Sequence, residues 1–533
     1  MLQDTSEIQS GQVIPADICV IGSGPAAFAL ALEFIDGAPT HRPLKVVMLE
    51  SQMQKPSIER AFAAAAGLDT ACDVQGLFYP GVLAGLLPVR ANNYLCCGPW
   101  AGRLREFGGT ANHWGGWDWP LEPWDLGGRP FHRGAAWPAG FDQILDRYYR
   151  RVTAAVMQLN AFEFDNPQFW IDSYPQFDLE QMCLPPGSPL RTRILQFNPI
   201  HFGNAYGPKV NASPYVDIFF NANALTLEMA PEGASRRATR LKVGSLTASC
   251  TPGNEWYVEA QNYVICTGGI ESTRFLLLND IGNQGGELGR TFMDNPYMAP
   301  GASFSLTSKL PRGVQDFYFS PRSLPGGPPY FSTFIAGLVP TEAYLKTHPD
   351  RGDFRILVGS QGSSVGLYVN TEPQPDPNSR ITLADPAEMK PDVFGQRRVR
   401  VDWETLSANG VNADTETLRA TFDTARQVLQ DELGYIEDFT VAEQDYQTKG
   451  WPEWRNAGGG LLVHPGLHPQ GSTRISSDPA TGVVDPNLRV HDTTNVFVSA
   501  SSNFPTAGYQ NPTFAVCALS VRLADHFIDA AKP

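Results

Sequence analysis

The start of the chain alternates between short and long apolar segments. Residues 17–21 (DICVI) and 45–49 (KVVML) are mostly apolar runs of strand length bounded by turn residues, which is typical of buried strands. Residues 26–34 (AAFALALEF) lie between them and are apolar over a length that favours a helix. The pattern therefore predicts strand, helix and strand in that order.

The same interleaving returns later in the chain. Residues 263–266 predict a buried strand and residues 271–278 a helix, while residues 398–403 alternate as a strand does. Helical spacing of apolar residues predicts helices over 414–433 and 513–527. Interleaved strands and helices place the chain in the α/β or α+β class.

The turn between the first strand and helix has the composition of a dinucleotide-binding loop. Gly22 allows a tight turn, Gly24 lets a pyrophosphate approach the backbone, and small Ala27 permits close helix–strand packing. Glu50 ends the second strand, where a carboxylate accepts hydrogen bonds from ribose hydroxyls. This loop does not separate NAD from FAD, but its position near the start, with the chain returning to it at the far end, favours FAD.

The charge of the chain limits its partners. The 533 residues carry 40 Lys and Arg against 55 Asp and Glu, a formal net charge of −15. Nucleic acids and anionic membrane surfaces require a positive field, so we expect neither as a partner. No apolar window reaches the roughly 18 residues of a membrane span. No export signal is visible at the start, and we expect a cytoplasmic protein.

Several of the 8 cysteines lie in apolar runs, which predicts buried thiols without disulfides.

Four motifs in a fixed order resemble the glucose-methanol-choline (GMC) family of FAD oxidoreductases. They are GGTANHWGGWDW from Gly108, LGRTFMDNP at 288–296, GLHPQGSTR at 466–474, and the C-terminal block VVDPNLRVHDTTNVFVSASSNFPTAGYQNPTFAV. Within the family, His113-Trp114 and Asn511-Pro512-Thr513 are most similar to pyranose 2-oxidase and related oxidases of sugars or glycosides.

The resemblance implies a Rossmann-like FAD-binding domain and a substrate domain built on a mainly antiparallel sheet with helices. Both domains would be discontinuous. We expect the FAD-binding domain in residues 1–125, 199–295 and 460–533, and the substrate domain in residues 126–198 and 296–459. Residues 370–403 resemble the substrate-domain sheet that covers the flavin. The tryptophans in and near these segments either fill the core or form platforms for sugar rings.

Oxidation of an alcohol requires a base beside the hydroxyl, because the flavin takes only the hydride. Histidine is suited to this role near neutral pH. The candidate is His468, whose counterpart is the catalytic base in the family. Asn511, at a position where family members carry His or Asn, is expected to orient the substrate oxygen.

The remaining predicted cofactor contacts come from the motifs. His113 aligns with a histidine that is covalently bonded to the flavin in pyranose 2-oxidases, but this chain has Asn-His-Trp where they have Thr-His-Trp, so the linkage is left open. The other expected contacts are Gly108, Gly109, Thr110, Asn112, Thr267, Gly268, Ser501, Asn511 and Thr513.

Several alternatives stay open at this point. The enzyme is expected to use oxygen, a quinone, a dye or a partner protein as electron acceptor, and its alcohol is a sugar, a glycoside or a non-sugar natural product. The oligomeric state is open, a homo-oligomer included.

Residues 362–366 fit G-x-S-x-G, but a strand and a Pro-rich turn follow, which favours a hairpin over a hydrolase elbow. A purely structural flavoprotein is disfavoured by His468 and Asn511. No metal site is expected, because Pro465 and Gly466 prevent helical spacing of His464 and His468.

Overall fold

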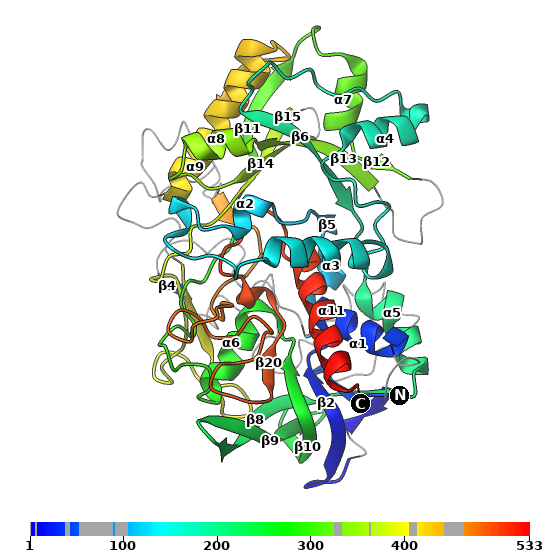
Figure 1. Cartoon of the computed structure of the whole chain (residues 1–533), viewed down its shortest axis with the longest axis vertical. Coiled ribbons are helices and arrows are strands. Elements are labelled where there is room, and N and C mark those ends of the chain that lie inside the picture. Colours follow the sequence, from blue (N-terminus) through cyan, green and yellow to red (C-terminus); the bar gives the residue numbers. More distant parts are fainter. Residues whose placement is uncertain are drawn as a thin grey trace.

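The computed structural model describes residues 2–5, 8–37, 43–52, 89–90, 105–324, 333–361, 364–403, 413–441 and 463–532. Two sheets lie at opposite ends of the elongated molecule, and α2 and α3 lie between them (Figure 1). The predicted mixed fold, with a Rossmann-like part and an antiparallel part, is confirmed.

The first sheet contains the strand–helix–strand unit predicted at the start of the chain. Its strands run in the order β1 (Leu2–Asp4), β7 (Val216–Phe220), β3 (Val46–Leu49), β2 (Val13–Ile21), β10 (Pro252–Ile265), β9 (Ser235–Leu246) and β8 (Asn223–Glu232), with β20 (Val496–Val498) also paired to β10. Pairs from β1 to β10, and β10 with β20, are parallel, whereas β10, β9 and β8 pair antiparallel.

Two apolar helices far apart in sequence pack together beside this sheet. These are α1 (Pro25–Gly37) and α11 (Thr513–Ala530), shown side by side in blue and red in Figure 1. Phe28 and Leu30 of α1 and Leu519 of α11 are buried in one core with strands β2 and β3. The apolar sequence of both helices therefore follows from burial, and their packing brings the two ends of the chain together.

The second sheet is antiparallel. Its strand order is β18 (Ile436–Val441), β11 (Pro296–Leu306), β15 (Ser364–Thr371), β14 (Phe354–Gln361), β13 (Thr333–Pro340), β6 (Leu190–Phe197) and β5 (Trp117–Asp118), and β12 (Arg322–Ser323) and β19 (Val463–Pro465) pair with β13 and β11. A separate core holds it to α4 (Pro167–Ser173), α7 (Arg312–Tyr318) and α9 (Ala413–Arg426). The other α-helices within the described residues are α2 (Pro123–Leu126), α3 (Phe141–Ala155), α5 (Phe202–Ala212), α6 (Gly268–Leu278) and α8 (Glu342–Thr347).

The elements predicted from periodicity are present, with shifted ends. The helix predicted over 414–433 is divided into α9 and a π-helical turn, Gln427–Glu432. The G-x-S-x-G residues 362 and 363 lie outside the described residues, but Gln361 and Ser364 pair across β14 and β15. That pairing is a hairpin, as expected, and no helix follows Ser364.

Two expectations are wrong. Residues 380–383 (β16) and 399–402 (β17) do not join the second sheet: they form a small sheet with β4 (Val89–Arg90) and pack on α6, because Ile381, Val399 and Val401 share a core with Ile270. Cys250 is disulfide-bonded, contrary to the expectation of free thiols. It lies in the turn between β9 and β10 and not in an apolar run.

Candidate active site

The glycine loop after β2 forms a narrow cradle. Gly22 has φ of 103°, and a Cβ there would lie 2.6 Å from the carbonyl oxygen of Cys266. Gly109 has φ of 69°, and its Cβ would lie 2.8 Å from the Cα of Gly24. Only glycine accepts these backbone angles without strain, so the residue types are explained by the close approach of three chain segments.

A buried carboxylate stands beside this cradle. Glu50 follows β3, accepts a hydrogen bond from the Ser23 hydroxyl, and accepts another from the Gln52 backbone N–H at 2.7 Å. Burial raises the pKa of Glu50, and the Ser23 hydrogen bond opposes that shift. Because a carboxylate has further lone pairs, Glu50 retains acceptor capacity toward the cavity that it lines.

A cavity of about 580 Å³ extends from the cradle to the second sheet. The structure brings most of the predicted site residues into its wall: Gly22, Gly24, Glu50, Gly109, Thr110, Thr267, Gly268, His468, Ser501, Asn511 and Thr513. Ala27 is buried beneath the loop instead, as its packing role requires. Gly108 and Asn112 also lie behind the wall, where Asn112 donates to the carbonyl oxygen of Phe107 at 2.9 Å. The side chain of His113 lies outside what the structure describes.

His468 and Asn511 meet at the far end of the cavity. The Asn511 Nδ2 donates to His468 Nε2 at 2.9 Å, although 43 residues separate them. The loop carrying His468 follows β19 and is bonded to the motif 288–296: the His468 backbone N–H donates to Asp294 Oδ1 at 3.0 Å. Two motifs of the sequence therefore form one structural unit.

Asn295 fixes the tautomer of His468. The Asn295 Nδ2 donates to the carbonyl oxygens of Thr371 and Gly508, at 3.0 and 2.9 Å. Its Oδ1 must therefore face His468 Nδ1, 2.9 Å away, and accept a hydrogen bond from it. With the proton held on Nδ1, the lone pair of His468 lies on Nε2, at the side of Asn511.

Arg355 fixes the orientation of Asn511. This guanidinium comes from β14 and donates from Nη1 to Asn511 Oδ1 at 3.1 Å. Because arginine only donates, the Asn511 amide must turn its Nδ2 toward His468. Burial, and then the positive charge of Arg355, lower the pKa of His468 to about 3. The imidazole is thus neutral near pH 7.

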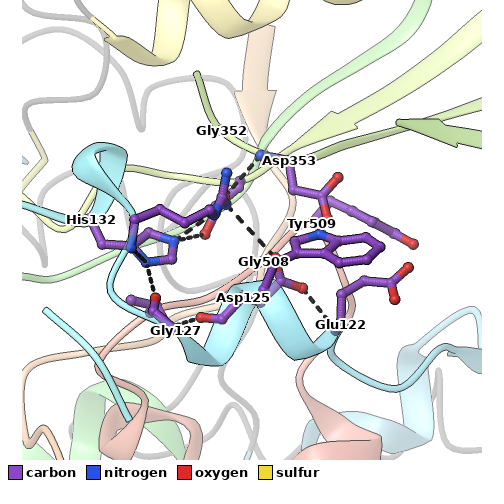
Figure 2. A network of polar contacts seen from close by, with 12 residues as sticks. Glu122, Asp125, Gly127, His132, Gly352, Asp353, Gly508 and Tyr509 are labelled. Carbon is purple, nitrogen blue, oxygen red and sulfur yellow. Dashed lines mark hydrogen bonds and ion pairs between the residues drawn. The ribbon is translucent and has the colours of Figure 1, made fainter. Parts of the chain in front are cut away.

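A buried polar network holds the loop that carries Asn511 (Figure 2). Asp125 in α2 lies under this loop and accepts hydrogen bonds from Glu122 N at 2.9 Å and Gln510 Nε2 at 3.0 Å. The Tyr509 carbonyl oxygen accepts from Asn370 Nδ2 at 2.7 Å. The loop is therefore tied to α2 and to β15 immediately before Asn511.

The carboxylates of this network titrate differently. Burial, with the charges of Asp353 and Glu372, raises the pKa of Asp125 well above its ordinary value. Burial also raises the pKa of Asp353 to about 7. For Glu372 the effect of burial is outweighed by Arg129 and His132, and its pKa falls to about 2. Glu372 is therefore the ionised member and Asp125 the protonated one.

Sequence reasoning missed two residues of the site. Asn295 lies within a motif that was recognised, and its position next to Pro296 carried no chemical signal of its own. Arg355 lies in a strand, Phe354–Gln361, without any motif. Only the tertiary structure places these two side chains beside Asn511 and His468.

Comparison with known proteins identifies a family domain in the chain. Residues 375–520 match the family model described as GMC oxidoreductase. The chain therefore carries a domain of the GMC oxidoreductases in its C-terminal part. It is 26% identical over 296 residues to the fructose dehydrogenase large subunit of Gluconobacter japonicus, which covers 52% of this chain. The matched part is 48% of that relative, so the chain spans about half the length of the curated protein it matches.

Solved structures of this fold cover almost the whole chain. Pyridoxine 4-oxidase from Mesorbium loti superposes with a TM-score of 0.57 at 17% identity, covering 96% of this chain and 99% of its own. A formate oxidase superposes with a TM-score of 0.58 at 14% identity, covering 98% and 99%. At these identities the likeness establishes the fold of this chain and nothing beyond it.

The cofactor is FAD, which GMC oxidoreductases bind. The cradle fits its ADP half: Gly22, Gly24 and Gly109 leave no side chain in the way, the start of α1 lines the cavity, and Glu50 offers a carboxylate to the ribose.

Among the helices of the described residues, none combines the length and apolarity needed to cross a membrane.

Proposed function

We propose that this protein oxidises an alcohol to a carbonyl compound, with a sugar or glycoside as the preferred class, in the manner of a pyranose oxidase. The observation that carries the proposal is the contact between Asn511 Nδ2 and His468 Nε2 at one end of the cavity. A neutral imidazole and an amide donor are the groups that a hydroxyl needs while it loses its proton.

His468 acts as the base in this proposal. The substrate hydroxyl replaces Asn511 at Nε2, and the Nε2 lone pair then receives the hydroxyl proton. Asn295 remains bonded to Nδ1 and stabilises the imidazolium. Asn511 then donates to the substrate oxygen as negative charge develops on it. Bound FAD supplies the acceptor for the hydride that leaves the carbon bearing this hydroxyl.

A second candidate function is a dehydrogenase that carries out the same oxidation but passes the electrons to an acceptor other than oxygen. The curated relative is the large subunit of a dehydrogenase. We therefore keep a quinone, a dye or a partner protein beside oxygen as acceptors, and a non-sugar alcohol beside a sugar as donor. We also propose the domain segments, the cofactor contacts and the cytoplasmic location that the sequence predicts.

Anaerobic mixing of the holoenzyme with sugars, glycosides and non-sugar alcohols tests the proposal. We expect at least one alcohol to bleach the flavin, and oxygen or a dye to restore the colour. His468→Ala is expected to slow bleaching by orders of magnitude while FAD content stays unchanged. Bleaching at the normal rate in His468→Ala would overturn the role of this residue.

The linkage of the cofactor needs a separate measurement. A bond to His113 keeps the flavin in an acid-precipitated pellet, and His113→Ala then releases it to the supernatant. A colourless pellet from the unaltered protein excludes the bond.

A further inference from the structure

A buried positive charge lies in the wall of the cavity, and no counter-charge pairs with it among the residues that the structure describes. Arg355 is 2% exposed, and within the described residues its guanidinium makes one hydrogen bond, to Asn511, and no ion pair. Arg193 in β6 is buried as deeply but pairs with Glu122 at 2.9 Å and Asp165 at 3.1 Å. The fold thus neutralises one buried arginine and leaves the other facing a cavity.

The surroundings of Arg355 hold the guanidinium in place without neutralising it. Its centre lies 4.8 Å from the ring centre of Trp117 and 5.3 Å from that of Trp119. Aromatic rings attract a cation and leave its N–H groups unsatisfied. Burial lowers the pKa of Arg355 to about 10, which still leaves it charged at neutral pH. A buried, unpaired guanidinium lowers the stability of the fold unless a bound group of opposite charge in the cavity pairs with it.

The position of this charge specifies what it would bind. One carboxamide, that of Asn511, separates Arg355 from the base His468. A group bound to Arg355 therefore lies within a few bonds of the hydroxyl at His468. The planar donor fork of arginine matches the two oxygens of a carboxylate.

We infer that the substrate is a hydroxy acid, a sugar acid included, whose carboxylate binds Arg355 while its neighbouring hydroxyl meets His468 and Asn511. This inference rests on the proposed function and narrows its substrate class. The hydroxyl proton goes to His468 and the hydride to FAD, so the product is an oxo acid and no further reactant is required. The negative net charge of the chain does not prevent a carboxylate from binding at Arg355. The attraction of a cation at hydrogen-bond distance is larger than the repulsion from surface charges that salt screens.

Binding can be measured without turnover. The oxidised holoenzyme is titrated with acetate and, separately, with acetamide, while the visible absorption of the flavin is followed. We expect acetate to bind about 10- to 100-fold more tightly than acetamide, as a charge-assisted bidentate contact implies. Arg355→Met should abolish this difference, and Arg355→Lys should retain part of it. The matched control is Arg312→Met, which removes one charge at a position that is 93% exposed.

Reduction of the flavin is then compared for paired alcohols, gluconate against glucose and glycerate against glycerol. We expect the acids to have the higher kcat/KM, with the preference lost in Arg355→Met and kept in Arg312→Met. Equal binding of acetate and acetamide would overturn the inference. So would an Arg355→Met variant that slows acids and neutral alcohols equally, since this is the effect of merely orienting Asn511. If carboxylates bind as expected but no alcohol reduces the flavin, the proposed function fails and the anion site stands.

Discussion

Asn295 Oδ1 accepts the Nδ1 proton of His468, and the same amide donates to the carbonyl oxygen of Gly508 in the loop that carries Asn511. One side chain thus sets the tautomer of the base and joins the two loops of the site. A metal-bound histidine often has a comparable partner on its second nitrogen, which shows how widely this arrangement fixes an imidazole.

Asn295→Asp should change the pH dependence of flavin reduction. A carboxylate at Nδ1 favours the imidazolium, so the pKa of His468 rises and the base is lost at a higher pH than in the unaltered protein. Stopped-flow reduction at a series of pH values measures the acidic limb of the profile. Asn295→Leu, which adds no charge, should slow reduction by roughly 10- to 100-fold without the same upward shift. An unchanged acidic limb in Asn295→Asp would contradict the assigned contact.

The depressed pKa of His468 also predicts how stability depends on pH. Its folded pKa is about 3, whereas the unfolded side chain titrates near its ordinary 6.5. Between these values the unfolded state binds the proton and the folded state does not, so this residue lowers stability as the pH falls through 6.5 toward 3. Thermal unfolding of holoenzyme from pH 7 to pH 4 measures the effect, and His468→Gln should show a smaller loss over the same range.

Asp125→Asn should stabilise the protein more at pH 8 than at pH 5. The raised pKa means that the folded state keeps a proton that the unfolded carboxyl releases above its ordinary value near 4, which costs stability as the pH rises. The neutral amide removes that cost and still accepts from Gln510. The melting temperature at the two pH values measures the difference. Glu372→Gln is the contrasting variant, expected to destabilise by about 3–5 kcal/mol because Arg129 loses its buried partner.

Gly22→Ala should lower FAD retention and the melting temperature together. Its Cβ would lie 2.6 Å from a backbone oxygen that cannot move aside, in addition to the strain of a positive φ. Gly187→Ala is the matched control, because Gly187 has φ of 78° and nothing within 4 Å of its Cβ. That control should cost only about 1–2 kcal/mol and leave the flavin content unchanged. Equal effects of the two variants would mean that crowding at the cradle is unimportant.

The sequence by itself determined the local elements and, through the family resemblance, the residues expected at the centre of the site. Apolar runs of strand and helix length gave β2, α1 and β3 because burial imposes those periods directly on the chain. His468 and Asn511 were expected in the site because their motifs resemble those of the GMC family. The exact ends of the elements were not predicted, since caps and neighbouring strands decide them.

Only the tertiary structure decided which side chains meet. Arg355 reaches Asn511 across 156 positions, and Asn295 reaches His468 across 173. Neither pairing leaves a local pattern, because it depends on how the second sheet lies over α11 and the loop before it. The same holds for β17, whose alternation predicted a strand correctly but gave no information about which sheet or helix would cover it. Periodicity indicates which residues are buried, and only tertiary packing decides which residues they contact.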